Sequence, residues 1–286
     1  MGGKLGWACN SCGAKYIKWQ GSCSSCNEWN TLEIILVEVK ERYAASSQVD
    51  ALPEPVDQIP LVDFPRIQSQ LEEFDRLLGG GVVTGSLNLL AGAPGIGKST
   101  LLLQLAHLFA RENQQVLYVS GEESKAQTSM RARRVGALAK DLLIMSETSY
   151  DKIVLQIQKI RPAIVMIDSI QILYKNDIAA AAGSIVQLRE LASAFLHLCK
   201  KQNITIFLVG HVTKSGEIAG PRVLEHLVDA VFEFEGDKSH GFRLLRSIKN
   251  RFGSTDEMAI FQMQENGLRQ VEKAAKVFLE EKTMAT

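Results

Sequence analysis

Long hydrophobic runs are missing from this sequence of 286 residues, in which every uninterrupted apolar stretch is shorter than ten residues. A membrane-spanning helix needs about 20 consecutive apolar residues, so the sequence predicts no membrane span. The first six residues contain one lysine and lead into polar, cysteine-bearing sequence, without the apolar core of a secretory signal. These absences favour a protein of the cytoplasm.

An excess of charge of one sign is also missing, because 32 Lys and Arg residues are balanced by 32 Asp and Glu residues. Any nucleic-acid partner must therefore be held by a local cluster of basic side chains rather than by the field of the whole chain. The hydrophobic share of 46% and the charged share of 22% exclude a disordered or fibrous chain and indicate a globular protein.

Composition divides the chain into four segments. Residues 1–33 form a compact unit rich in Cys and Trp, and residues 34–60 form a polar linker that contains prolines. Residues 61–272 alternate short β-branched runs with longer stretches of helical periodicity, which is typical of an α/β domain. Residues 273–286 remain as a C-terminal tail.

The α/β segment is predicted to form a mostly parallel sheet with an antiparallel extension. Parallel strands are expected at residues 87–91, 116–120, 142–145, 163–168 and 205–210, and helices at residues 98–113, 124–135, 151–159 and 183–200. The extension is expected to contain the strands at residues 230–235, 242–249 and 258–263. The strand at 116–120 is expected to lie beside the strand at 87–91.

A glycine-rich loop follows the first of these strands and opens a helix. It matches G-x-x-x-x-G-K-[ST], the phosphate-binding loop of nucleotide hydrolases, in the strand and helix context that this chemistry requires. Backbone N–H groups and the helix N-terminus would face the phosphates, Lys98 would reach their β and γ oxygens, and Ser99 would ligate Mg²⁺. The predicted ATP-binding residues are Gly92, Ala93, Pro94, Gly95, Ile96, Gly97, Lys98, Ser99 and Thr100.

Polar side chains at three other strand ends complete the predicted ATP site. Asp168 ends an apolar strand and suits the Walker B position that holds the Mg²⁺ shell. Glu122 and Glu123 follow the strand at 116–120, and one of them is expected to polarise the attacking water, although helix-start carboxylates exposed to solvent would give the same pattern. His211 follows another strand and is expected to sense the γ-phosphate, with a surface histidine as the alternative.

The four cysteines near the N-terminus form a metal-binding pattern. Cys9, Cys12, Cys23 and Cys26 make two C-x-x-C pairs separated by ten residues, which suits four thiolates around one Zn²⁺. An iron or iron-sulfur site could use the same ligands, whereas disulfides are disfavoured in a cytoplasmic ATPase. The aromatic residues of this unit are expected to pack on the cysteine turns, with base stacking as the alternative.

Taken together, these motifs resemble the RadA (Sms) family of bacterial DNA repair and recombination ATPases. The resemblance covers about residues 5–270 and is carried by the four cysteines, the Tyr118–Ser124 segment, the Gly210–Lys214 segment and above all the Lys249-Asn250-Arg251-Phe252-Gly253 motif. It implies a RecA-like ATPase core, a hexameric ring, and a DNA-dependent motor that promotes branch migration on single-stranded or branched DNA. A recombinase or replicative helicase is the protein partner that it implies.

The resemblance also assigns roles to individual residues. Lys98 and Ser99 would bind nucleotide and Mg²⁺, Asp168 the metal, and Glu122 the attacking water. Lys249 and Arg251 would act on ATP bound by the neighbouring subunit. The DNA contacts that it implies are Lys175, Lys214 and Arg222, in loops that face DNA in RecA-like rings.

The sequence departs from the family pattern at its C-terminal end. The family chain continues into a Lon-protease-like domain after an Asn-Pro-Ser step, whereas this sequence ends at Thr286 without either. A fragment, a truncated gene and a divergent short form all fit this difference. Two other functions also remain open, a RecA-fold regulatory ATPase that is indifferent to DNA and a zinc-anchored adaptor that uses nucleotide as a switch.

Overall fold

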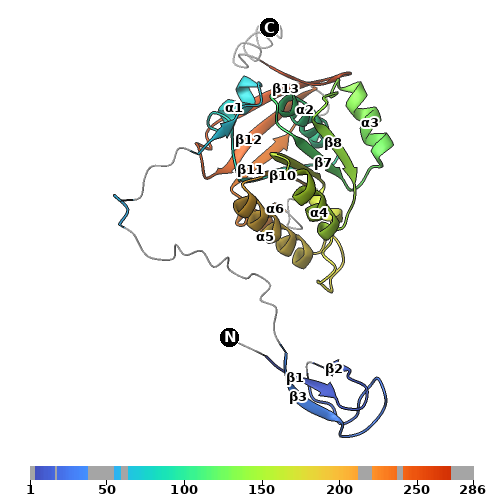
Figure 1. Cartoon of the computed structure of the whole chain (residues 1–286). Helices are drawn as coiled ribbons and strands as arrows, with labels where there is room; N and C mark the ends of the chain where they lie inside the picture. Colours follow the sequence, from blue (N-terminus) through green and yellow to red (C-terminus); the bar gives the residue numbers. More distant parts are fainter. Residues whose placement is uncertain are drawn as a thin grey trace. The chain divides into compact units, whose positions relative to one another are not determined.

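The computed structural model describes residues 4–16, 18–37, 55–58, 64–211, 221–236 and 241–271. The chain divides into two compact units, Met1–Val62 and Asp63–Thr286 (Figure 1). Each unit is described by itself. None of the described helices combines the length and the apolar character that a membrane crossing requires.

The N-terminal unit is built on a small antiparallel sheet with the strand order β2-β1-β3. The strands are β1 (Lys4–Cys9), β2 (Lys15–Tyr16) and β3 (Leu32–Val37). β3 pairs with β1 along its full length, from Leu32 opposite Cys9 to Val37 opposite Lys4. The strand therefore continues four residues beyond residue 33, into the segment predicted to be a linker.

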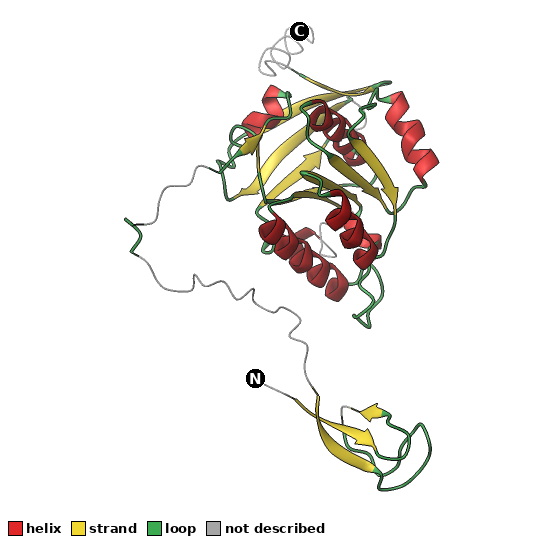
Figure 2. Cartoon of the chain, viewed as in Figure 1, coloured by secondary structure: helices red, strands yellow, loops and turns green. Residues whose placement is uncertain are grey.

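The second unit is an α/β domain around a nine-stranded sheet (Figure 2). The strand order is β14-β13-β12-β11-β6-β10-β9-β7-β8. The six strands from β11 to β8 run parallel to one another, and β12, β13 and β14 add to them antiparallel. The strands are β6 (Leu87–Gly92), β7 (Val116–Ser120), β8 (Leu142–Ser146), β9 (Ile164–Asp168), β10 (Thr205–His211), β11 (Ala230–Glu235), β12 (Phe242–Asn250), β13 (Met258–Gln264) and β14 (Gly267–Gln270).

Two details of the predicted topology are wrong. β7 does not lie beside β6, because β10 and β9 are inserted between them. β11 is predicted to belong to the antiparallel extension, but it pairs parallel with β6, and the extension begins only at β12. The first error concerns the order of strands and the second their direction, and local periodicity encodes neither.

Helices cover both faces of the sheet, as Figure 2 shows. The helices are α1 (Glu72–Leu77), α2 (Lys98–Arg111), α3 (Lys125–Arg134), α4 (Tyr150–Ile160), α5 (Ile185–Gln202) and α6 (Pro221–Glu225), with a 3₁₀ turn η1 at Ile170–Ile172 and a short strand pair β4 (Arg66–Ile67) and β5 (Val82–Val83). One apolar core lies under α1, α2 and α3, and a second lies under α4, α5 and α6.

The sheet divides its side chains between these two cores with a period of two. In β7, Val116 and Tyr118 enter the core under α2, whereas Leu117 and Val119 enter the core under α4 and α5. All five residues of this strand are buried. A parallel strand with helices on both faces has no solvent side, which is why these strands occur as continuous apolar runs in the sequence.

Candidate functional site

The predicted nucleotide-binding residues meet at the carboxyl ends of four neighbouring strands. The phosphate loop follows β6, His211 ends β10, Asp168 ends β9, and Glu122 follows β7. The register brings them level, because His211 pairs with Gly92 and Asp168 pairs with Ser120. In open α/β sheets, ligands bind in the crevice outside the carboxyl ends of the strands.

The phosphate loop has a backbone that favours glycine at two positions. Gly97 has φ +118° and forms the N-cap of α2, and a Cβ there would lie 2.9 Å from Cε of Met263. Gly95 has φ +76°, and a Cβ there would meet no atom within 4 Å, so this glycine faces open space. No side chain caps the first N–H groups of α2. These groups are therefore free to bind an anion.

The side chain of Lys98 contacts the backbone of the phosphate loop. Its Nζ donates hydrogen bonds to the carbonyl oxygens of Gly92 and Ala93 at 2.8 and 2.9 Å, and the residue is 3% exposed. Burial lowers the pKa of Lys98 to about 8, and this effect exceeds the opposing attraction of Asp168 and Glu122. A phosphate placed at the loop would supply a close anionic partner for this buried ammonium.

Asp168 is nearly buried at 8% exposure and is held by an aromatic hydroxyl. The Tyr118 hydroxyl donates a hydrogen bond of 2.7 Å to Oδ2 of Asp168. Burial, followed by the charge of Asp168, raises the pKa of Tyr118 well above its usual value, so this hydroxyl remains a donor. Nη1 of Arg131 lies 3.9 Å from the same carboxylate oxygen. The carboxylate has oxygen lone pairs left for the water shell of Mg²⁺, which suits hard cations.

Glu122 faces the phosphate loop. Its Oε1 accepts a hydrogen bond of 2.7 Å from the Ser169 hydroxyl and lies 3.4 Å from Nε2 of His211. Burial raises the pKa of Glu122, but the hydrogen bonds from Ser169 and His211 outweigh burial and hold this pKa below its usual value. Glu122 is therefore ionised at neutral pH and fits the role of a group that orients or deprotonates water.

Glu123 points to a different partner. Its carboxylate forms an ion pair with Arg131 of α3, and its backbone N–H donates to the Ser120 hydroxyl. α3 begins directly afterwards at a capping box, in which the Ser124 side chain accepts from the Gln127 backbone. Glu123 is thus neutralised by a cation of its own chain, whereas Glu122 is directed toward the phosphate loop.

The space above the loop forms an open pocket of about 500 Å³. Glu122 and His211 line it together with Arg131 and Arg134 of α3 and Met263 of β13. The phosphate-loop residues in its wall are Pro94, Gly95, Gly97, Lys98, Ser99 and Thr100. The pocket thus combines a phosphate loop, a carboxylate and two arginines, a donor set that fits ATP with Mg²⁺.

Residues of the antiparallel extension form hydrogen bonds with the phosphate loop and with the helix that follows it. Arg243 of β12 is buried and donates from Nε to the carbonyl oxygen of Ile96 at 3.0 Å. Gln104 of α2 donates to the carbonyl of Leu268 and accepts from its N–H, which ties α2 to β14. The extension is therefore part of the frame that holds the loop.

Lys249 and Arg251 lie near the amino ends of the parallel strands, opposite the carboxyl ends where the phosphate loop begins. The Arg251 backbone N–H donates to the carbonyl of Asp229, and the Asp229 N–H donates to the carbonyl of Leu87, the first residue of β6. The phosphate loop begins at the other end of β6, on the order of 17 Å away at about 3.3 Å per residue. Arg251 therefore does not reach the phosphate loop of its own chain.

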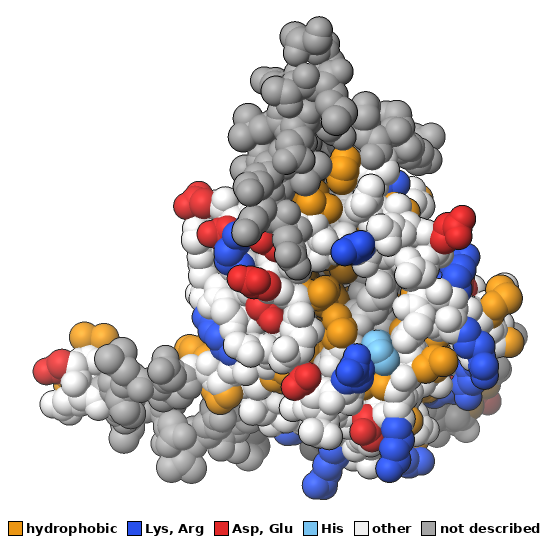
Figure 3. All heavy atoms as spheres, turned by 90° about the horizontal axis from the view of Figure 1, so that it is seen from above, with side chains coloured by type: hydrophobic (Ala, Val, Ile, Leu, Met, Phe, Trp, Pro, Cys, Tyr) orange, Lys and Arg blue, Asp and Glu red, His pale blue; other side chains and the backbone are white. Residues whose placement is uncertain are grey.

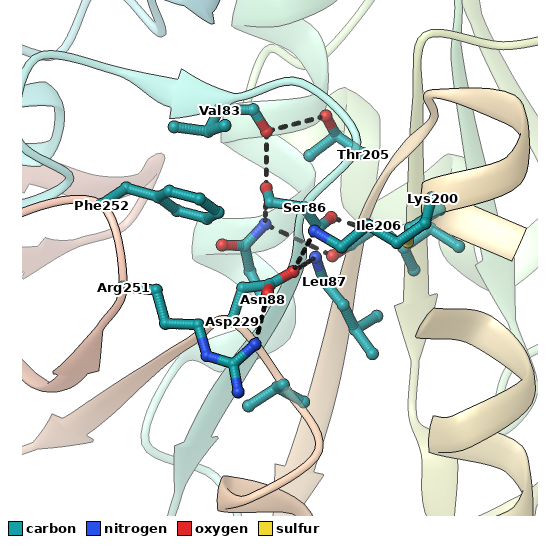
Figure 4. A network of polar contacts seen from close by, with 12 residues as sticks. Val83, Ser86, Leu87, Asn88, Lys200, Thr205, Ile206, Asp229, Arg251 and Phe252 are labelled. Carbon is teal, nitrogen blue, oxygen red and sulfur yellow. Dashed lines mark hydrogen bonds and ion pairs between the residues drawn. The ribbon is translucent and has the colours of Figure 1, made fainter. Parts of the chain in front are cut away.

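The two basic side chains of this motif have different partners. Nζ of Lys249 donates to the carbonyl oxygens of Glu225 and Val228 at 2.6 and 2.8 Å, at the end of α6. Burial and then the charge of Arg251 lower the pKa of Lys249. Nη1 of Arg251 lies 3.3 Å from Oδ1 of Asp229, and its side chain is 54% exposed (Figure 4).

The predicted DNA contacts are only partly covered by the structure. Nζ of Lys175 lies 4.9 Å from the ring centre of Tyr150 and 3.8 Å from Asp177, and its side chain is 18% exposed. Lys214 lies outside the described residues, and for Arg222 only the backbone is described, in α6. The face in Figure 3 carries side chains of both signs, in agreement with the balanced charge of the sequence.

The four N-terminal cysteines converge on one point. Their sulfur atoms all lie within 4.8 Å of one another, and the pairs Cys9 with Cys26 and Cys12 with Cys23 are 3.6 and 3.5 Å apart. Sulfurs around a tetrahedral Zn²⁺ at about 2.3 Å are roughly 3.8 Å apart, so the cluster fits such an ion. None of these cysteines is in a disulfide.

Contacts with hydroxyl groups lower the pKa of two of these cysteines and so favour the thiolate that a metal requires. The bond between the Tyr16 hydroxyl and Sγ of Cys23 lowers the pKa of Cys23 to about 6. Contact with the Thr31 hydroxyl lowers the pKa of Cys9. The tryptophans fit the packing prediction only in part. Trp19 lies edge-on to Trp7 with ring centres 6.4 Å apart, but the side chains of Trp19 and Trp29 are 57% and 74% exposed.

Sequence reasoning missed several residues of the site. Tyr118 and Ser169 hold the two central carboxylates. Ser169 belongs to no motif, and Tyr118 opens the Tyr118–Ser124 segment without having been assigned a role. Arg131 and Arg134 carried a usable signal, because their spacing of three places both on one face of the helix that follows the Glu pair. Arg243 of β12 was also missed, since its contact with the loop depends on strand order.

Two family matches cover most of the chain. Residues 52–217 match the AAA domain family, and residues 7–33 match a family described as a rubredoxin metal binding domain. The first match agrees with the phosphate loop and its partners. The second agrees with the convergence of the four cysteines on a metal site.

Curated relatives match nearly the whole chain. DNA repair protein RadA of Bacillus subtilis is 48% identical over 285 residues, which are 98% of this chain and 62% of that protein. DNA repair protein RadA of Halalkalibacterium halodurans is 46% identical over 284 residues, with 98% and 62% covered. For the protein of the same name in Chlamydia trachomatis, the values are 47% over 283 residues, with 99% and 62% covered. The chain thus spans about three fifths of the length of these relatives.

Proposed function

The chain belongs to the AAA domain family and is a relative of the DNA repair proteins RadA, and from this premise we propose that it is a DNA-dependent ATP hydrolase of recombination and repair. The observation that carries the proposal is the convergence of Lys98, Asp168, Glu122 and His211 at one edge of the sheet. Lys98, Asp168 and Glu122 are of the kinds that phosphoryl transfer to water requires, and His211 lies beside the water-orienting carboxylate.

Binding begins at the phosphate loop. Phosphate oxygens take the place of the Gly92 and Ala93 carbonyls as partners of the Lys98 ammonium, while the free N–H groups of α2 face the same anion. Ser99 and Asp168 are the residues that would hold Mg²⁺, and the ion would supply positive charge to neutralise the phosphates. The negative charge that collects on the transferred group is thereby stabilised.

Glu122 acts on the attacking water. Its ionised carboxylate is fixed by Ser169 and stands next to His211, so it can orient the water and accept its proton. His211 ends the strand beside β6, and a change in its contact with Glu122 would transmit the state of the γ-phosphate to the segment that follows. Glu123 has a structural role as the partner of Arg131.

A second copy of the chain completes the site. Arg251 is half exposed and lies at the end of the parallel strands opposite its own phosphate loop. Both observations support a role of its guanidinium on ATP held by a neighbouring protomer. A ring or filament repeats such a contact from one copy to the next. Lys249 is predicted to act on the same neighbouring ATP, but its Nζ contacts carbonyl oxygens of its own chain at the end of α6. In the proposal it therefore fixes the start of the turn that carries Arg251.

The DNA partner enters the proposal through the similarity to RadA proteins. The segments around Lys175, Lys214 and Arg222 are the proposed contacts with single-stranded or branched DNA, in a motor that promotes branch migration. The N-terminal unit carries one zinc ion on Cys9, Cys12, Cys23 and Cys26, where the sulfur positions fit a tetrahedral ion.

The test is the rate of ATP hydrolysis with and without single-stranded DNA over a range of salt concentrations. The proposal predicts stimulation by DNA that weakens with salt, because phosphate contacts release counterions. The Lys98→Ala variant serves as the control for contaminating ATPases. A rate that is unchanged by DNA at every salt concentration would contradict the proposal and support a regulatory ATPase instead.

A further inference from the structure

The Asp229 carboxylate contacts the guanidinium of Arg251. The residue is 1% exposed, and its carboxylate accepts from three donors that come from three different parts of the domain. Oδ2 accepts from the Leu87 backbone N–H and from Nζ of Lys200, each at 3.0 Å, and Oδ1 lies 3.3 Å from Nη1 of Arg251. Figure 4 shows these side chains directed toward one another.

The three donors hold the Asp229 carboxylate in one position. Leu87 is the first residue of the strand that leads to the phosphate loop, and Lys200 lies in the last turn of α5. The backbone of Asp229 adds two bonds, from its own N–H to the carbonyl of Leu87 and from the Arg251 N–H to its carbonyl. A buried carboxylate with this many donors cannot move without leaving some of them unsatisfied.

The turn that carries Arg251 is fixed on its other side as well. Nη2 of Arg66 donates to the carbonyl of Phe252 at 2.7 Å, and the Phe252 ring lies 5.8 Å from that of Phe64. A Cβ on Gly79 would lie 3.3 Å from Cα of Gly253, so the two glycines allow a close approach of the backbones. Contacts with the rest of the domain therefore fix the backbone conformation of residues 251–253.

The guanidinium itself is held by one edge only. Within the part of the chain that the structure describes, Nε and Nη2 of Arg251 make no hydrogen bond, and the side chain is 54% exposed. An arginine presents five donors in a rigid fork, so one nitrogen can remain on a carboxylate while the others bind an anion. The Arg251 guanidinium thus contacts the buried Asp229 carboxylate through one nitrogen, and its other nitrogens remain available to bind an anion.

We propose that Asp229 is a positioning residue for Arg251, which it orients toward the phosphates of ATP bound by a second copy of the chain. The inference rests on the proposed function, in which Arg251 acts on a neighbouring site. Asp229 touches no nucleotide and acts only through the guanidinium. An arginine that reaches across an interface loses much of its effect when it is displaced by about 1 Å, which can cost on the order of 100-fold in rate.

The test compares single-turnover ATP hydrolysis, with DNA present, for Asp229→Asn, Arg251→Ala and the double variant. The asparagine keeps the shape and an oxygen for the Leu87 N–H but removes the charge that orients Arg251. The expected result is a loss on the order of 10- to 100-fold for Asp229→Asn, with nucleotide affinity unchanged. In the Arg251→Ala background the same change should cause no further loss, because residues that act as a unit are not additive.

Lys200→Met is the matched control. It removes another partner of the same carboxylate, together with the position of Nζ 5.8 Å from the Phe252 ring centre, but it leaves the Arg251 contact in place. Its hydrolysis rate should therefore stay within about threefold of that of the unmodified chain. If Asp229→Asn fails to fold, the Asp229→Asn, Lys200→Met double variant removes one of the unpaired cations and is used instead. This double variant should lose activity while Lys200→Met alone does not.

Three results bear on the inference in different ways. Full activity of Asp229→Asn together with inactive Arg251→Ala overturns the positioning role and leaves the proposed function standing. An equal loss from Asp229→Asn with and without Arg251 also overturns it, because the effect would then pass through Leu87 and the frame of the domain. Full activity of Arg251→Ala contradicts the proposed trans site itself, and the positioning role with it.

Discussion

The Ser169 hydroxyl donates a hydrogen bond of 2.7 Å to Oε1 of Glu122 and joins the ends of two neighbouring strands, β9 and β7. The bond turns the first of two adjacent glutamates toward the phosphate loop. Glu123 turns instead to Arg131 of α3. The two adjacent glutamates thus have different partners, and we assign the reactive role to Glu122 and a structural role to Glu123.

Glu122→Gln should bind ATP normally and turn over at least about 100-fold more slowly. The amide keeps the shape of the side chain but cannot accept the proton of water, and general-base contributions are typically about 10²- to 10⁴-fold. Pre-steady-state hydrolysis and nucleotide titration measure the two effects separately. Glu123→Gln is the matched control, and slow turnover in that variant alone would reverse the assignment.

The environment of Lys98 predicts proton uptake on ATP binding in alkaline solution. Burial lowers the pKa of Lys98 to about 8, so the free protein holds a growing fraction of neutral amine above that pH. Phosphate beside the amine favours the ammonium form, and binding at about pH 9 must therefore take up a proton that binding at about pH 7 does not.

Calorimetry in buffers of different ionisation enthalpy measures this uptake. Lys98→Arg is the control, because a guanidinium stays charged over the whole range and its binding should be independent of the buffer. Absence of proton uptake by the unmodified chain at about pH 9 would rule out a titrating Lys98. Equal uptake by the arginine variant would assign the proton to another group.

The N-terminal unit should contain one zinc ion per chain. Four sulfurs within 4.8 Å of one another provide a complete tetrahedral ligand set, and Tyr16 and Thr31 favour the thiolate form of two of them. Elemental analysis of protein never exposed to a chelator tests this prediction, and Cys199→Ser is the control because that thiol is buried far along the chain. Iron in place of zinc would contradict the metal assignment, and less than half an equivalent of any metal would contradict the site.

Charge reversal of Lys175, Lys214 and Arg222 together should weaken binding of single-stranded DNA and leave hydrolysis without DNA nearly unchanged. The change removes cations that would bind phosphate, so the salt dependence of binding should also become shallower, by roughly one unit of slope for each cation reversed. Fluorescence anisotropy over a salt series measures both effects. Reversal of the exposed residues Lys140, Lys152 and Arg269 matches the change in charge and should have a much smaller effect. Unchanged affinity in the first variant would exclude these loops as the DNA surface.

The sequence predicted what is local and missed what depends on strand order. The phosphate loop, the strand ends at Asp168 and His211, and the cysteine cluster each reside in one short segment. Within its own unit, the structure brings the phosphate loop together with Asp168 and His211, and in the N-terminal unit it brings the four cysteine sulfurs together. The neighbours of β6 could not be derived, since β10 and β9 are inserted between β6 and β7 by long crossovers. Contacts that cross the sheet, such as Arg243 on Ile96, escaped for the same reason.

The Asp229 network shows a second limit of sequence reasoning. Arg251 belongs to a motif and can be identified from it, but its anchor lies 22 residues earlier in a segment without any motif. A single buried aspartate before an apolar strand has many explanations in a sequence. Only the fold shows that it faces Leu87, Lys200 and Arg251 at once.

The most direct test of the account is a mixing experiment on the shared ATP site. Arg251→Ala chains retain an intact phosphate loop, and Lys98→Ala chains retain an intact Arg251, so each alone should hydrolyse ATP on the order of 10³-fold more slowly than the unmodified chain. Hydrolysis is measured across a range of mixing ratios, with mixed oligomers verified by a tag on one variant. The account predicts that activity recovers and is greatest near equal amounts, because intact loops then meet intact arginines. Failure to recover at any ratio, with mixed oligomers present, would contradict a site shared between two copies of the chain.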